Sequence, residues 1–173
     1  MERQQHGFSF EQEMIRKYGI IKSKEYTSKW DGKLNGFPVS IKIAKYGTDI
    51  EMADIFRQME VEEDFYLIVG FWQDNKMNIV ERYMLKINGK EYHSLFNLDF
   101  KQRLQSLLCE ITNSHEDDEK WRLQITQLRK DWKNGTPNLI RLRFKRDHKS
   151  QKRIQCAINN KDFYNYFIKR YEV

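Results

Sequence analysis

Asp31 and Lys42 are the two residues whose types and spacing most clearly suggest chemistry. Asp31 lies at the end of one predicted strand, and Lys42 lies in the middle of the next, otherwise apolar strand. A lysine with its stem against a core is uncommon unless its charge is needed there. A carboxylate can bind a hard divalent cation, and a nearby ammonium can orient a water molecule or offset negative charge. The pair could therefore hold a metal ion and act on a water beside it.

The two residues are expected to meet in a β-hairpin. Strands are predicted over residues 22–31 and 36–45, with a turn at 32–36 in which glycine and asparagine tolerate positive φ. Side chains alternate along a strand, so Lys42 shares a face with Ser40 and has small neighbours on that face. The opposite face carries Phe37, Val39, Ile41 and Ile43. Pairing of the two strands could bring the Asp31 carboxylate near Lys42.

The elements around the hairpin follow from capping boxes and apolar periodicity. Ser9 and Gln12 predict a helix over about 9–18, and Thr48 and Glu51 predict a second helix that begins near residue 50. The apolar run DFYLIVGFW and the segment MNIVERYMLKI predict two central strands.

The second half of the chain is predicted to contain helices and a basic hairpin. A helix is expected over about 99–111, and another after Ser114, whose last turn carries Arg129, Lys130 and Lys133. Cations in a last turn complement the helix dipole. A hairpin over about 139–158 and a C-terminal aromatic helix, KDFYNYFIKRYEV, follow.

Composition and element order predict one folded domain of the α/β or α+β class. The chain has 173 residues, of which 39% are hydrophobic and 32% charged, enough for one full core. We expect a mixed central sheet flanked by helices, with a core over about 8–90 and the helices and basic hairpin over about 97–173. The net charge of +6 modestly favours a polyanionic partner.

An aspartate on one strand, followed by a short strand with Ser40-Ile41-Lys42, resembles the PD-(D/E)XK nuclease superfamily, and within it a type II restriction endonuclease. The resemblance covers roughly the first half of the chain, from GFSFEQE through the helix expected after Lys42. It implies a restriction-endonuclease-like fold and Mg²⁺-dependent hydrolysis of phosphodiester bonds in double-stranded DNA, with Mn²⁺ as a possible substitute.

Each catalytic candidate has a role and an alternative. Asp31 would bind the metal, the resemblance implies the Ile41 carbonyl as a further ligand, and Lys42 would orient or deprotonate the attacking water. Ser40 stands where the family usually has an acid, so Glu51 is the candidate for the missing carboxylate and Glu11 for one near the metal water. Alternatively, Asp31 is a turn residue, Lys42 a snorkelling lysine, and Glu51 only the partner of Thr48 in a capping box.

Basic residues are the candidates for DNA contacts. The strand LIRLRFKR alternates cationic with apolar side chains, which predicts a hairpin with one cationic face. Arginines on such a ribbon could read guanine edges while lysines meet phosphates. The alternative is a solvated outer face. The DNA-binding candidates are Lys33, Arg141, Arg143, Lys145, Arg146, Lys149, Lys152 and Arg153.

The remaining expectations concern partners and location. A homodimer would let two active sites meet both strands of a symmetric DNA site. We expect no small-molecule cofactor, no membrane association and a cytoplasmic location, because no signal peptide or membrane span is seen. The alternative functions are a Holliday-junction or repair nuclease on the same fold, or a DNA-binding module without catalysis.

Overall fold

The computed structural model describes residues 2–23, 29–73, 78–113, 118–146 and 152–173, although the side chains of 2–6, 113, 118–120 and 146 lie outside this description. The fold is mixed α+β, as predicted. Its contacts divide the chain into two compact units. The first unit holds residues 1–50, 62–91 and 159–173, and the second unit holds 51–61 and 92–158. A single domain over 1–173 stays a prediction.

The first unit is built on a five-stranded mixed sheet with the order β1-β2-β3-β5-β6. Strands β1, β2 and β3 pair antiparallel, β3 and β5 pair parallel, and β5 and β6 pair antiparallel. Both predicted central strands are present, and so is a hairpin that contains β3. The strand predicted over 22–31 is wrong, because the strand paired with β3 is residues 32–34, within the predicted turn, and the described residues 29–31 are not in a strand. The strands are β1 (Ile21–Lys22), β2 (Gly32–Leu34), β3 (Phe37–Lys45), β5 (Phe65–Trp72) and β6 (Ile79–Ile87).

Helix α1 (Glu2–Tyr18) covers one face of this sheet. Its buried Phe10 and Met14 pack with the apolar side chains of Val39 and Ile41. Gly70 on β5 leaves room for this helix, because a Cβ there would lie 2.5 Å from the Phe10 ring. The alternation predicted for 36–45 thus turns one face of β3 toward α1, and Lys42 lies on the other face.

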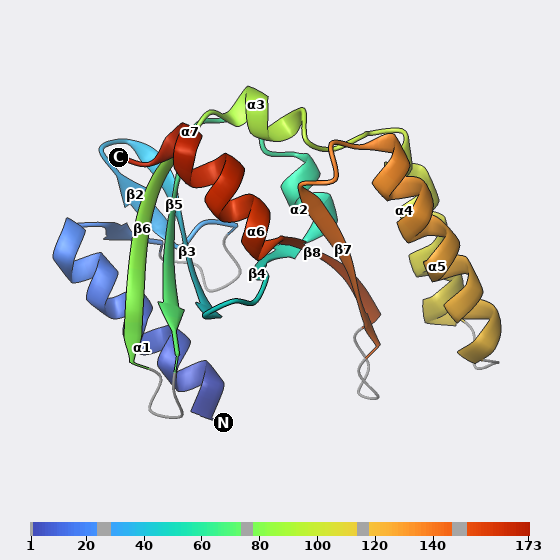
Figure 1. Ribbon diagram of the computed structural model, residues 1–173, viewed down its shortest axis with the longest axis horizontal. Coiled ribbons are helices and arrows are strands. Elements are labelled where there is room, and N and C mark those ends of the chain that lie inside the picture. The colour runs from blue at the N-terminus through green and yellow to red at the C-terminus, as the bar shows by residue number, and fades with distance from the viewer. Residues whose placement is uncertain (1, 24–28, 74–77, 114–117, 147–151) are drawn as a thin grey trace. The chain divides into compact units, whose positions relative to one another are not determined.

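The C-terminal segment packs on that other face. It comprises α6 (Asn160–Asp162), a π-helix, η1 (Phe163–Ile168), and α7 (Lys169–Tyr171), so the predicted aromatic helix is present (Figure 1). The centre of the Phe163 ring lies 5.6 Å from that of Phe71 on β5 and 5.7 Å from that of Tyr83 on β6. This segment belongs to the first unit, although the sequence analysis grouped it with the second half of the chain.

Glu91 of α3 (Gly89–His93) fastens the end of the C-terminal segment. Arg170 donates two hydrogen bonds to its carboxylate, at 3.0 and 2.8 Å, and the Tyr171 hydroxyl donates a third at 2.5 Å. The hydrogen bonds from Arg170 and then Tyr171 lower the pKa of Glu91 to about 2.

The second unit pairs a three-stranded sheet with two long helices. The sheet has the order β4-β8-β7, with β4 (Ile50–Asp54), β7 (Ile140–Arg146) and β8 (Lys152–Ile158). Helices α4 (Phe100–Asn113) and α5 (Asp118–Gly135) run side by side in Figure 1. Trp132 of α5 donates a hydrogen bond of 2.7 Å to the Ile140 carbonyl, which ties this helix to β7. The predicted helices and basic hairpin are confirmed.

The helix predicted to begin near residue 50 is wrong. Residues 50–54 form strand β4, and a short helix, α2 (Ile55–Met59), begins only after Asp54, whose carboxylate caps the backbone N–H groups of Phe56 and Arg57. Ile50 and Met52 are buried while Glu51 is exposed, a period of two rather than of a helix. The Thr48 hydroxyl donates to the Lys45 carbonyl, which closes a turn.

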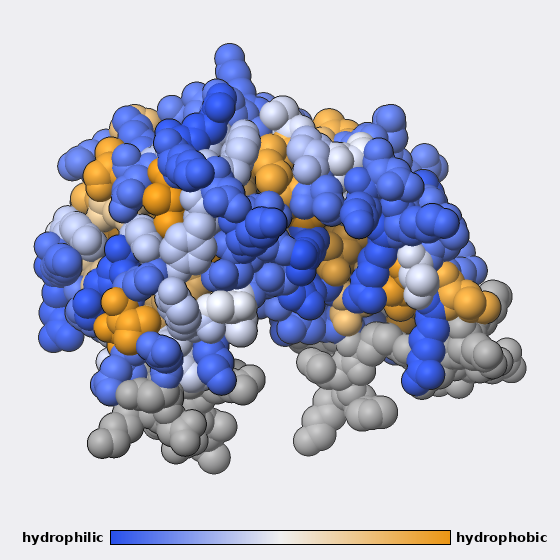
Figure 2. Space-filling view, viewed as in Figure 1, coloured by the Kyte–Doolittle hydropathy of each residue, from blue (hydrophilic) through white to orange (hydrophobic). Residues whose placement is uncertain are grey.

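The surface is strongly polar. Hydrophilic residues cover most of the face shown in Figure 2, with scattered hydrophobic patches between them. Within the described parts of the chain, no helix has both the length and the apolar character needed to cross a membrane.

Replacement of Glu91 by glutamine should weaken folding most above pH 5. The folded pKa of Glu91 is lowered, so its contribution is complete above its ordinary pKa of 4.5 and is lost as pH falls toward about 2. We expect Glu91→Gln to lower the thermal midpoint at pH 6, and the gap to wild type to close by pH 2.5. Glu13→Gln, which removes an ion pair to Arg82 on the surface, is the control. A pH-independent gap for Glu91→Gln would contradict this role.

Candidate active site

Backbone hydrogen bonds place Asp31 immediately before β2. Its N–H donates to the Val39 carbonyl at 2.9 Å, and its own carbonyl accepts from the Ser23 N–H at 3.1 Å. Its carboxylate Oδ2 accepts a hydrogen bond of 2.6 Å from the backbone N–H of Ile41. These hydrogen bonds therefore hold the Asp31 side chain against β3.

Lys42 lies beside this carboxylate on the face of β3 turned away from α1. Its Nζ is 3.8 Å from Asp31 Oδ2, which makes an ion pair but is too long for a hydrogen bond. The Lys42 side chain is 22% exposed and the Asp31 side chain 31% exposed. Both charges are thus partly shielded, yet both can be reached from solvent.

Neighbouring contacts fix the chain on either side of Asp31. The Trp30 indole N–H donates to Glu63 at 2.9 Å, and the Trp30 ring lies 5.0 Å from Phe65. On the other side, Gly32 allows β1 to approach closely, because a Cβ there would lie 2.6 Å from the Ile21 carbonyl oxygen. The position of Asp31 therefore depends on a glycine and an anchored tryptophan.

Ser40 and Ile41 complete the group on β3. Ser40 is 5% exposed and lies on the same face as Lys42. The Ile41 side chain is buried in the cluster under α1, so only its backbone is available to the candidate site. The structure brings together Asp31, Ser40, Ile41 and Lys42.

Glu11 and Glu51 have their contacts elsewhere. Glu11 lies on α1 and forms an ion pair of 3.3 Å with Lys22, on the sheet face opposite to Lys42. Glu51 lies on β4 in the second unit, where its carboxylate is 3.9 Å from Arg143 and 4.0 Å from Lys145. The alternative that Glu51 is a capping-box partner is excluded, since it lies in a strand.

A divalent cation at this site would need a set of oxygen ligands. Among the described residues, no three His, Cys, Asp or Glu side chains form a metal-binding group. Among the described residues, none donates a hydrogen bond to Asp31 Oδ1, while Oδ2 accepts one from the Ile41 N–H. One available carboxylate oxygen is compatible with Mg²⁺, which keeps several waters and often uses only one or two carboxylates. The residues present therefore fit the ion at this minimal level.

A further carboxylate lies on the same sheet face and is occupied by tyrosines. Glu81 of β6 accepts hydrogen bonds from Tyr83, at 2.9 Å, and from Tyr164 of η1. Burial and then the bond to Glu81 raise the pKa of Tyr83 to about 12 and raise that of Tyr164 as well. Both phenols thus stay protonated as donors, and Glu81 serves to attach the C-terminal segment. The sequence analysis did not single out this cluster.

The basic candidates divide into several groups. Arg141, Arg143 and Lys145 alternate with buried Ile140 and Leu142 on β7, as predicted for a cationic strand face. Lys152 donates to the Ile111 carbonyl at the end of α4, which is a structural contact. Lys33 and Arg153 are exposed, whereas Lys149 and the side chain of Arg146 lie outside the described residues.

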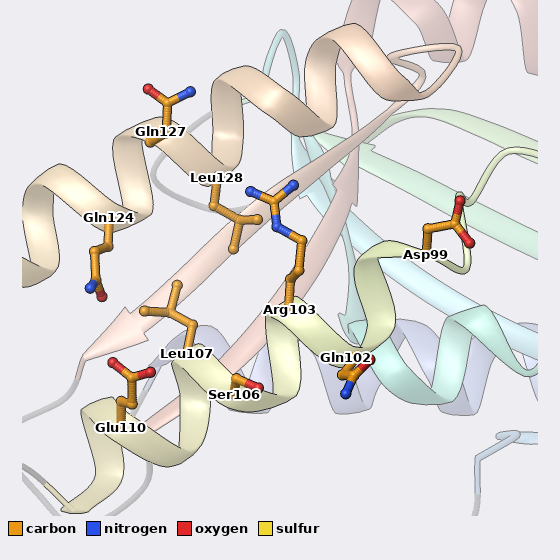
Figure 3. Close-up of a pocket in the computed structure, with 9 residues that line it drawn as sticks. All are labelled: Asp99, Gln102, Arg103, Ser106, Leu107, Glu110, Gln124, Gln127 and Leu128. Atoms are coloured by element: carbon orange, nitrogen blue, oxygen red, sulfur yellow. The ribbon is translucent and has the colours of Figure 1, made fainter.

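Two hollows among the described residues of the second unit lie beside α5. One, of about 470 Å³, lies between α4 and α5, where Leu107 and Leu128 point toward each other and Arg103 points toward α5 (Figure 3). Arg103 is held there by an ion pair of 2.5 Å with Asp131. The other hollow, of about 300 Å³, is lined by Arg141 and Arg143 together with Arg129 and Lys133 of α5. The sequence analysis had assigned Arg129 and Lys133 only to the helix dipole.

Comparison with known proteins gives no match of any kind: no family model, no curated protein and no solved structure matches the chain.

Removal of the Asp31 side chain should destabilise the hairpin. Asp31→Ala leaves the partly buried Ile41 N–H without its acceptor, and we expect a loss of about 1–2 kcal/mol in the free energy of unfolding, measured in urea. Asp31→Asn keeps an acceptor oxygen and should lose about half as much. An Asp31→Ala variant as stable as wild type would show that this hydrogen bond contributes nothing to folding.

Proposed function

We propose that the chain is a metal-dependent endonuclease that hydrolyses phosphodiester bonds in double-stranded DNA, as a type II restriction enzyme would. The observation that carries the proposal is the Asp31–Lys42 pair, held 3.8 Å apart by the Ile41 N–H between two paired strands. The order of helix, hairpin with an acid before the second strand, and lysine within that strand supports the resemblance to the PD-(D/E)XK superfamily. The parallel pairing of β3 with β5 is compatible with that fold at a coarse level.

The residues would divide the chemistry as follows. Mg²⁺, held by Asp31 and the Ile41 carbonyl, would polarise the scissile phosphate and lower the pKa of a bound water. Lys42 would donate a hydrogen bond to the attacking water and offset the negative charge that develops on the phosphate. Its partial burial strengthens that electrostatic effect, because fewer water molecules screen the ammonium. The buried Ser40 would shape the site rather than bind the ion.

The basic residues would hold the substrate. Arg141, Arg143 and Lys145 present a cationic strand face, and phosphate contacts of this kind supply most of the affinity for DNA. A homodimer would place one active site on each strand of a symmetric recognition sequence. A cytoplasmic location, where such a DNA substrate would be met, belongs to the same proposal.

A second function, DNA binding without cleavage, is favoured by one observation. Ser40 stands where an acid is usual, and the contacts of Glu51 in the second unit are with Arg143 and Lys145. Under this alternative, Asp31 and Lys42 form an ion pair that only supports the hairpin.

Cleavage of long unmethylated DNA distinguishes the two functions. We expect sharp fragments with Mg²⁺ or Mn²⁺, none with chelator, and a loss of activity of at least about a hundredfold in Lys42→Ala and Asp31→Asn. Lys45→Ala is the matched control, since Lys45 lies three residues further along β3 on the opposite face.

Substrate choice separates the remaining alternatives. A restriction enzyme should cut linear duplexes at a fixed sequence, whereas a junction or repair nuclease should prefer branched or damaged DNA. Intact DNA under every metal, with binding unchanged by Lys42→Ala, would favour the non-catalytic module.

A further inference from the structure

The smaller hollow of the second unit gathers positive charge without a compensating acid in its lining. It lies between the C-terminal part of α5 and β7, has a volume of about 300 Å³, and is lined by Arg129, Lys133, Arg141 and Arg143, together with Trp132, Asn138 and Leu142. None of these seven lining residues is acidic. Four cations that line one concave surface attract an anion that enters it.

Arg129 lies against the strand side of the hollow. Its guanidinium lies 5.2 Å from the centre of the Phe144 ring, an arrangement that holds it against the strand. Burial, and then the charge of Arg143, lower the pKa of Arg129. An anion bound between Arg129, which is exposed, and Arg143 would be attracted by both charges.

A buried tryptophan joins the two sides of the hollow. Trp132 is 2% exposed, and its indole N–H donates to the Ile140 carbonyl at 2.7 Å, so α5 and β7 are joined directly beneath the cations. The side chains that would meet a ligand therefore project from two elements that are fixed to each other. Preorganised cations lose less conformational entropy when they bind an anion.

The helix dipole explains only part of this arrangement. Lys133 lies in the last turn of α5, where a cation is favourable. The dipole gives no reason for Arg141 and Arg143 of β7 to line the same hollow as the helix cations. Arg143 also lies 3.9 Å from Glu51 of β4, so that carboxylate balances part of its charge.

We propose that this hollow binds a phosphate of the nucleic-acid backbone and so clamps the duplex against α5 and β7. The inference rests on the proposed function, since DNA is taken as the source of the phosphate. It adds Arg129 and Lys133 to the residues that meet the substrate, and it assigns them a role independent of base sequence. Guanidinium groups suit this role because their planar donors match phosphate oxygens in pairs.

DNA affinity in chelator tests the clamp. Short labelled duplexes of two unrelated sequences are titrated with the full chain at several salt concentrations, and binding is followed by fluorescence anisotropy. Arg129→Gln and Lys133→Gln should each weaken binding roughly fivefold on both sequences and lower the slope of log Kd against log salt by about one. Lys130→Gln, a neighbouring α5 cation outside the hollow, is the matched control and should change affinity by less than about twofold.

Three results would overturn the inference. The first is that Arg129→Gln and Lys133→Gln bind DNA as tightly as Lys130→Gln does. The second is a loss confined to one of the two sequences, which would mean base readout. The third is that inorganic phosphate stabilises wild type but not Arg129→Gln, while the two proteins bind DNA equally well. That result would mean a site for free phosphate compounds. If Arg129→Gln fails to fold, the exposed Lys133 and Arg141 carry the same test.

Cleavage with Mg²⁺ separates this inference from the proposed function. If wild type binds DNA through Arg129 and Lys133 but never cuts it, the clamp stands and the nuclease proposal fails. If cutting requires Lys42 while the Arg129 and Lys133 variants bind and cut like wild type, the nuclease proposal stands and the clamp fails.

Discussion

The hydrogen bond of 2.6 Å from the Ile41 N–H to the Asp31 carboxylate is the contact on which the candidate site depends. It links the residue before β2 to the middle of β3, so the acid and the lysine one residue further along are positioned by the same peptide. The remaining structure supports this contact. Helix α1 buries the Ile41 side chain, Gly32 lets β1 come close, and Trp30 anchors the preceding turn.

Local patterns were sufficient for much of the fold. Alternation in FPVSIKIAK and the apolar run in FYLIVGFW predict β3 and β5, because burial of a strand face leaves a signal in consecutive residues. The same reasoning brought Asp31 and Lys42 together in one hairpin, although Asp31 lies just before β2 and not at the end of the strand predicted over 22–31. It failed at residues 50–54, where the spacing of Ile50, Ala53 and Ile55 suggested a helix although Ile50 and Met52 follow the period of a strand. The positive φ of Ala53 and the cap at Asp54, which set the true start of α2, leave no periodic signal.

Residues far apart in the sequence were predicted less well, for a physical reason. Whether Glu11 or Glu51 approaches Lys42 depends on which sheet face a helix covers and which strand a segment joins, and neither is decided locally. Glu11 instead pairs with Lys22, and Glu51 with Arg143 and Lys145. The hollow lined by Arg129 and Arg143 likewise needs α5 to pack on β7. In the sequence, Arg129 and Lys133 were visible only as cations at a helix end, and Arg141 and Arg143 only as cations of a separate strand.

The first unit is discontinuous, since residues 159–173 return to cover the sheet formed by residues 21–87. Phe163 contacts Phe71 and Tyr83 across this long separation, and Arg170 reaches back to Glu91. During synthesis the face that carries Lys42 therefore stays uncovered until residues 159–173 leave the ribosome. The closing of so long a loop is slow compared with local helix formation. A chain synthesised only as far as residue 158 would thus hold the hairpin in a sheet whose Lys42 face still lacks its covering segment, and full order at this face would come only after residues 159–173 have been made.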